Sequence, residues 1–98
     1  MVDESLLPDT IQSIQKYVEI ESAPSYEALL EVLTSVVTYL LLHDMEKLLN
    51  ILYRIDVNEP KVKAAFAQND PKLIAPTIAR LILEREVQKA ESRRKHRG

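Results

Sequence analysis

The sequence contains no cysteine, and its single glycine is the C-terminal Gly98. Without cysteine the chain has no disulfide framework, no thiolate metal ligand and no cysteine nucleophile, which fits a reducing compartment. Without an internal glycine it lacks Asn-Gly and Asp-Gly hairpin turns and glycine-rich phosphate loops. These two absences argue against sheet architectures and against the common nucleotide-binding motifs.

Histidine is also scarce, since only His43 and His96 occur. Neither stands in an H-E-x-x-H or E-x-x-H arrangement, so helix-borne zinc and di-iron sites lack their ligand spacing. The dipeptide His43-Asp44 resembles that of the HD-type metal phosphohydrolases, but that family needs further histidines. A helix-end histidine followed by a capping aspartate accounts for the pair. No serine has a plausible set of triad partners, and we expect no enzyme activity, no metal and no other cofactor.

Composition favours one folded domain spanning residues 1–98, because 46% of the residues are hydrophobic and 29% are charged. The N-terminus carries Asp3 and Glu4 where a secretory signal would need a basic start. The most apolar stretch, residues 29–42, is interrupted by polar residues and is too short to cross a bilayer. We expect a cytoplasmic protein without a membrane span.

The N-terminal quarter of the chain predicts one amphipathic helix. Leu7, Ile11, Ile14 and Val18 recur at steps of four, three and four residues. Asp9 with Gln12 is compatible with a capping box. We therefore predict a first helix over residues 9–20, followed by a connector in which Ser22 and Ser25 are candidate helix caps.

The strongest helical pattern begins at Tyr26. Apolar residues follow one another there at steps of three or four and stay in phase as far as Ile55. A single helix over 26–55 would be about 45 Å long, which is long for a domain of this size. Because aspartate is a good N-cap, we favour a break at His43-Asp44 and two helices.

The remaining prolines divide the C-terminal half into two further helices. A short helix follows Pro60, and a last helix follows Pro71, with Pro76 either kinking it or beginning its regular part. From Glu84 onward we expect the chain to leave the core, with residues 88–98 as an exposed basic tail. The predicted fold is all-α: a compact bundle of four to five helices with a long central hydrophobic helix and an extended basic C-terminal helix.

Charge is distributed unevenly along the chain. Residues 1–70 contain five Lys or Arg against twelve Asp or Glu, a net of −7, whereas residues 71–98 contain eight against three, a net of +5. Basic clusters can engage phosphates, anionic lipid or an acidic protein face. The interpretation that we favour is a solvated helix C-terminus whose cations oppose the helix dipole, and a third is pairing with the acidic body of the same or another copy. The glutamates of this segment fit a solvated helix face. The candidate phosphate-binding residues are Arg85, Lys89, Arg93, Arg94, Lys95 and Arg97.

Two tyrosines indicate a contact surface. Tyr39 and Tyr53 lie off the main apolar stripe, beside Leu42 and Ile51 respectively, and would leave apolar area uncovered in a monomer. Tyr39, Leu42, Ile51 and Tyr53 are therefore the candidate partner-binding residues. We predict a non-enzymatic helical protein–protein interaction or adaptor module that forms a homodimer or homo-oligomer or binds a protein partner. The alternative is a nucleic-acid-associated protein that contacts phosphates through its basic C-terminal helix.

Two segments also carry a resemblance. The stretch 51–59, Ile-Leu-Tyr-Arg-Ile-Asp-Val-Asn-Glu, and the stretch 78–86, Ile-Ala-Arg-Leu-Ile-Leu-Glu-Arg-Glu, are similar to parts of small bacterial proteins without an assigned function. The resemblance covers the C-terminal half at most. It implies a bacterial cytosolic origin and brings no activity, site or partner with it.

Overall fold

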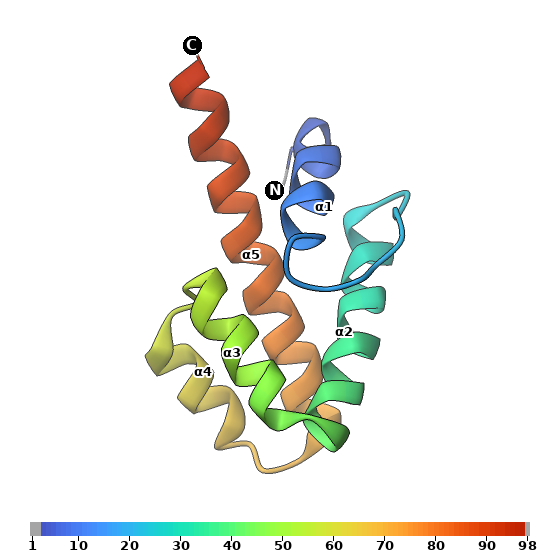
Figure 1. Ribbon diagram of the computed structural model, residues 1–98, viewed down its shortest axis with the longest axis vertical. Helices are drawn as coiled ribbons and strands as arrows, with labels where there is room; N and C mark the ends of the chain where they lie inside the picture. Colours follow the sequence, from blue (N-terminus) through green and yellow to red (C-terminus); the bar gives the residue numbers. More distant parts are fainter. Residues whose placement is uncertain (1–2, 98) are drawn as a thin grey trace.

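The computed structural model describes residues 3–97 and the side chains of residues 3–96. This part of the chain is helical without a strand, which confirms the predicted all-α class. A short 3-10 turn precedes five α-helices that match the expected bundle (Figure 1). The elements are η1 (Glu4–Leu6), α1 (Leu7–Ile14), α2 (Tyr26–His43), α3 (Met45–Ile55), α4 (Glu59–Phe66) and α5 (Pro71–Arg97).

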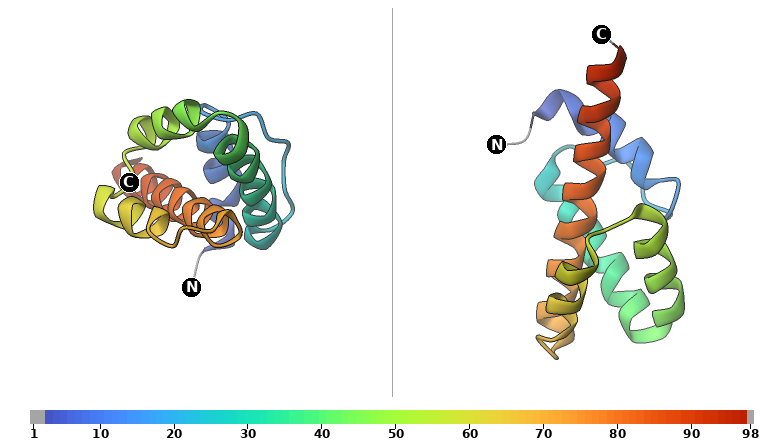
Figure 2. Two further views of the ribbon diagram at one scale, coloured as in Figure 1. Left: turned by 90° about the horizontal axis from the view of Figure 1, so that it is seen from below. Right: turned by 90° about the vertical axis from the view of Figure 1, so that its left-hand side faces the viewer.

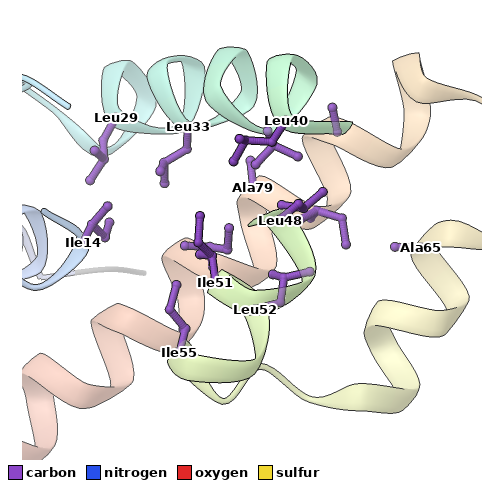
Figure 3. Packing of buried hydrophobic residues seen from close by; sticks show 14 of the residues in the cluster. Ile14, Leu29, Leu33, Leu40, Leu48, Ile51, Leu52, Ile55, Ala65 and Ala79 are labelled. Atoms are coloured by element: carbon purple, nitrogen blue, oxygen red, sulfur yellow. The ribbon is translucent and has the colours of Figure 1, made fainter. Parts of the chain in front are cut away.

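Helix α5 is the axis of the bundle, since it packs against η1 and against each of the other four helices. It runs the length of the molecule, and its C-terminal turns project beyond the other helices (Figure 2). The long apolar helix α2 lies along it, and α3 returns beside α2. Figure 3 shows Leu29, Leu33 and Leu40 of α2 on one side of the core, with α3 supplying the opposing side chains Leu48, Ile51, Leu52 and Ile55.

The predicted break between α2 and α3 is confirmed at Asp44. Its backbone leaves the helical region (φ −153°, ψ 71°), and its carboxylate accepts a hydrogen bond from the N–H of Lys47 at 3.1 Å. At the other end of α2, the Ser25 hydroxyl accepts the N–H of Ala28 at 3.0 Å. Both helix starts therefore have a side-chain cap that satisfies a free backbone donor. Ser22 remains in the connector and caps neither helix.

Replacing Asp44 with Ala is expected to lower the free energy of unfolding by about 1 kcal/mol, because the N–H of Lys47 loses its cap. Asp44→Asn keeps an accepting oxygen at the same place and should unfold close to the wild-type midpoint. Urea denaturation followed by circular dichroism measures both variants. Equal stability of the alanine and asparagine variants would contradict the capping role.

By length and composition alone, helix α2 could cross a membrane. The core helices of soluble proteins can have the same length and composition. In this fold the four buried side chains of α2, Leu29, Leu33, Val37 and Leu40, belong to the hydrophobic core and face α3 and α5. The helix therefore packs as part of the bundle.

Helix α1 is shorter than predicted. It begins at Leu7, with Pro8 in its first turn, and ends at Ile14. The prediction of residues 9–20 was wrong at both ends, and Asp9 lies inside the helix where a capping box would need it at the N-cap. The chain continues beyond α1 as a turn, in which the N–H of Tyr17 and that of Val18 both donate to the carbonyl of Ile14, and the side-chain amide of Gln15 donates to the carbonyl of Ile20 at 3.0 Å.

Helix α5 stays in the core longer than its polar sequence suggests. It passes through Pro76 without ending, and the expectation that the chain leaves the core at Glu84 was wrong. Glu86, Val87 and Ala90 are all buried, because α1 and η1 pack against this stretch of α5. Residues 91–96 beyond it are exposed.

The N-terminal turn is fixed to α5 by polar contacts. The carboxylate of Asp3 accepts hydrogen bonds from the hydroxyl and the N–H of Ser5, and these bonds hold its pKa below the usual value. The guanidinium of Arg94 donates to the carbonyl of Ser5 at 3.0 Å and lies 3.6 Å from the Asp3 carboxylate. Tyr26 donates its hydroxyl to the carbonyl of Asp3 at 2.8 Å, and burial raises the pKa of this phenol. These contacts join η1, α2 and α5.

Candidate functional site

The four residues predicted to bind a partner do not form one surface. Ile51 is only 4% exposed and lies in the core, so its assignment as a contact residue was wrong. It stands three residues after Leu48 and four before Ile55, and this spacing places it on the buried face of α3. Tyr53, two residues further, points to the opposite side and is 84% exposed.

Helix α3 carries a line of exposed apolar side chains; Met45 and Leu49 belong to the apolar pattern that predicted the core, whereas Tyr53 was predicted to bind a partner. Met45, Leu49 and Tyr53 follow one another at steps of four, and their exposed fractions rise from 38% through 49% to 84%. The signal was present in the sequence, because a helix that starts at Asp44 and buries Leu48 and Ile55 must turn this line toward solvent. We call these three residues the α3 stripe.

Tyr39 and Leu42 are exposed, but they line two different hollows. Leu42 faces a hollow of about 420 Å³ formed with Thr34, Thr38 and the start of α5 at residues 70–76. Tyr39 places its ring 4.7 Å from the imidazole of His43. Tyr39 also lines the larger hollow described below. Tyr39 and Leu42 therefore line different hollows, although they stand three residues apart on α2.

Arg85 and Arg94, two of the predicted phosphate-binding residues, have partners inside the molecule. Arg85 donates through Nε to the carbonyl of Asp56 at 3.1 Å, and its guanidinium lies 3.6 Å from the Asp56 carboxylate. Asp56 is the left-handed C-cap of α3 (φ 65°), so Arg85 places a positive charge at the end of that helix. Arg94 is the residue that contacts Asp3 and Ser5.

Lys89 belongs to a buried polar cluster between α1 and α5. Its Nζ lies 2.9 Å from Oε1 of Glu86, whose side chain is completely buried, and the other oxygen of Glu86 accepts the hydroxyl of Ser13. Glu86 is thus a core residue and not part of the solvated face that its sequence suggested. Because Ser13 and Glu86 are both buried, the pair has no open route to a substrate. The cluster joins α1 to α5.

Arg93 and Lys95 are exposed and have no ion pair within residues 3–96, whereas the side chain of Arg97 lies outside the described residues. Three of the six candidate cations are therefore held by carboxylates of the same molecule, namely Arg85, Lys89 and Arg94. Phosphate contact through the C-terminal helix stays a prediction, with fewer free charges than the sequence suggested.

A hollow of about 670 Å³ lies between residues 15–19, the outer side of α2 and the start of α3. Lys16, Glu19, Ser35 and Lys47 supply polar groups to its lining. Tyr17 also lines this hollow, and two cations approach its ring. The guanidinium carbon of Arg54 lies 5.3 Å and Nζ of Lys89 lies 5.4 Å from the ring centre, both within cation–π range. The grouping of Arg54 and Lys89 around Tyr17 could not be recognised from the sequence, since it depends on the turn after α1.

Among the described residues, no group of three or more histidines, aspartates and glutamates is arranged to hold a metal ion. Comparisons with protein-family models, with curated proteins and with solved structures found no match to this chain. The implied bacterial origin therefore stays a prediction, and the functional argument depends on the side chains alone.

Proposed function

We propose that this chain is a non-enzymatic cytoplasmic interaction module that forms a homodimer through the outer face of α3. The observation that carries the proposal is the α3 stripe: Met45, Leu49 and Tyr53 form a continuous apolar line on one helix, exposed to solvent. Exposed apolar lines of this kind are typical of contact surfaces.

A second copy suits this face because the face is complementary to itself. In an antiparallel pair of α3 helices centred on Leu49, Met45 of one copy lies beside Tyr53 of the other. Antiparallel pairing also brings the N-terminal end of each α3, with Glu46 in its first turn, to the C-terminal end of the other α3, so that the two helix dipoles oppose each other.

The proposed dimer is weak. Full burial of one Leu or Met side chain contributes about 1.5–3 kcal/mol, and association itself costs several kcal/mol. A contact centred on three side chains from each copy therefore predicts a dissociation constant on the order of 100 µM. The population of the dimer should depend steeply on protein concentration.

Leu49→Glu is expected to keep the protein monomeric at all concentrations, because each dimer would bury two unpaired carboxylates at the centre of the contact. Sedimentation equilibrium from about 10 µM to 1 mM measures the average mass, which should rise toward the dimer for the wild type. The matched control is Leu73→Glu on α5, where the leucine is 52% exposed against 49% for Leu49. A wild type that is monomeric at about 1 mM, or a Leu73→Glu variant that dissociates equally, would exclude the α3 contact.

A further inference from the structure

The hollow beside the turn after α1 gathers positive charge from an acidic part of the chain. Residues 1–70 contain only five Lys or Arg against twelve Asp or Glu. Two of the five, Lys16 and Lys47, line the hollow, and a third, Arg54, lies beside it over Tyr17. Such a concentration of cations in a segment with a net charge of −7 requires an explanation.

The cations come from separate elements that the fold brings together. Lys47 and Arg54 are seven residues apart on α3, so they share one flank of that helix. Lys16 comes from the turn that the Gln15 side chain closes, and Lys89 comes from α5. Within residues 3–96, only Lys89 of these four has an ion-pair partner, Glu86. Of these four cations only Lys16 and Lys47 line the hollow, and a bound anion would compensate their positive charges.

The apolar and aromatic residues of the hollow indicate what kind of ligand, besides its acidic group, would fit there. Val18, Val36 and Leu40 provide an apolar wall, and Tyr39 presents an exposed aromatic ring at the edge of the hollow. A volume of about 670 Å³ lies within the range of roughly 300–1,000 Å³ that small-molecule sites occupy. The other half of the lining is polar or charged, so the hollow is more polar than a typical small-molecule site and suits a ligand that is itself charged at one end.

Glu19 lines the same hollow and limits the charge of the ligand. With Lys16 and Lys47 the lining sums to two positive charges and one negative charge, a net of +1. A ligand with a single acidic group comes closest to this balance: one carboxylate equals it, and one phosphate monoester exceeds it by up to about one charge at neutral pH. The Glu19 carboxylate accepts hydrogen bonds from donors on the ring of such a ligand. A polyanion would be repelled by the same carboxylate.

We propose that this hollow binds a small organic anion with an aromatic ring, of about the size of a mononucleotide. Its acidic group, a phosphate or a carboxylate, lies between Lys16 and Lys47, and its ring lies against Val36, Leu40 and Tyr39. The site does not use the α3 stripe, so it is independent of the proposed dimer contact.

The test follows backbone amide NMR shifts of the full-length protein during titration with four probes: adenosine monophosphate, indole-3-acetate, adenosine and inorganic phosphate. Either aromatic anion should bind in the micromolar to millimolar range, about tenfold or more tighter than adenosine or phosphate. The shifts should be confined to residues 15–19, 35–40 and 47. The phosphate and carboxylate arms distinguish the two kinds of acidic group.

Lys16→Met and Lys47→Met should each weaken binding of the preferred anion about tenfold, because each removes one charge-assisted contact. Lys63→Met is the matched control, since Lys63 is exposed on α4 and pairs with Glu59 away from the hollow. It removes the same charge and should leave the affinity unchanged. Absence of binding by both aromatic anions at about 10 mM would overturn the proposal, as would shifts centred on the C-terminal turns of α5 or equal effects of all three variants.

Discussion

Replacing Lys89 with Met is expected to lower the free energy of unfolding by about 2 kcal/mol, far more than a typical surface lysine contributes. The reason is that this substitution leaves the buried carboxylate of Glu86 without its positive partner. Glu86 has no solvent-exposed surface, and Lys89 supplies the only opposite charge within 4 Å of it among the described residues. Without Lys89, the one side-chain partner of this buried carboxylate that remains within residues 3–96 is the Ser13 hydroxyl.

The companion variants separate this cause from a simple loss of packing. Glu86→Met should cost less, because the Lys89 head retains 22% exposure and can turn to water. The double variant Lys89→Met with Glu86→Met should recover most of the lost stability, since it leaves no buried charge and only an unpaired Ser13 hydroxyl, worth about 1 kcal/mol. Urea unfolding at neutral pH measures all three.

Lys63→Met again serves as the control for charge removal. Its pair with Glu59 spans 3.5 Å, and both side chains are more than three-quarters exposed, so its loss should change stability by less than about 0.5 kcal/mol. If Lys89→Met behaved like Lys63→Met, or the double variant were no more stable than Lys89→Met, Glu86 would not depend on its lysine.

Local chemistry made much of the helical layout predictable. Asp44 ends one helix and caps the next through its own side chain, and this interaction depends only on residues within three positions of it. Ser25 begins α2 in the same way. Where a boundary is set by neighbours in the sequence, the sequence alone is sufficient to place it.

The error over Glu86 came from an interaction between distant residues. Ser13 and Glu86 are 73 positions apart, so no local pattern could show that this glutamate would be covered by α1. A partial signal was present, because Glu86 stands four residues after Ile82 and four before Ala90, on the buried side of α5. Charge alone had suggested a solvated face.

The candidate sites also differ in how far they could be predicted from the sequence. The α3 stripe follows from the break at Asp44 and from helical spacing, so it could have been predicted once the break was accepted. The hollow lined by Lys16 and Lys47 could not be predicted from the sequence, since Lys16 reaches it only through the turn after α1. The basic C-terminal segment was visible as composition, but its intramolecular partners Asp3, Asp56 and Glu86 were not.

Leu48 and Leu49 are adjacent on α3, but replacing them with alanine should change the free energy of unfolding by very different amounts. Leu48 is completely buried among α2 and α5 side chains (Figure 3), and Leu48→Ala is expected to lower the free energy of unfolding by about 3 kcal/mol. Leu49 is half exposed, and Leu49→Ala should change the stability of the monomer by less than about 0.5 kcal/mol. The two variants delete the same atoms one position apart, so helix propensity cannot explain a difference between them.

The same pair separates the core from the proposed contact surface. At low concentration, chemical denaturation should show the large loss only for Leu48→Ala. At high concentration, sedimentation should show weaker self-association only for Leu49→Ala, provided that both proteins are measured where they are folded. Equal losses of stability in the two variants would contradict the assignment of Leu48 to the core and Leu49 to the surface. Unchanged self-association of Leu49→Ala would show that any dimer contact lies elsewhere. Stability and association thus respond to different leucines because helical spacing turns neighbouring residues toward different surroundings.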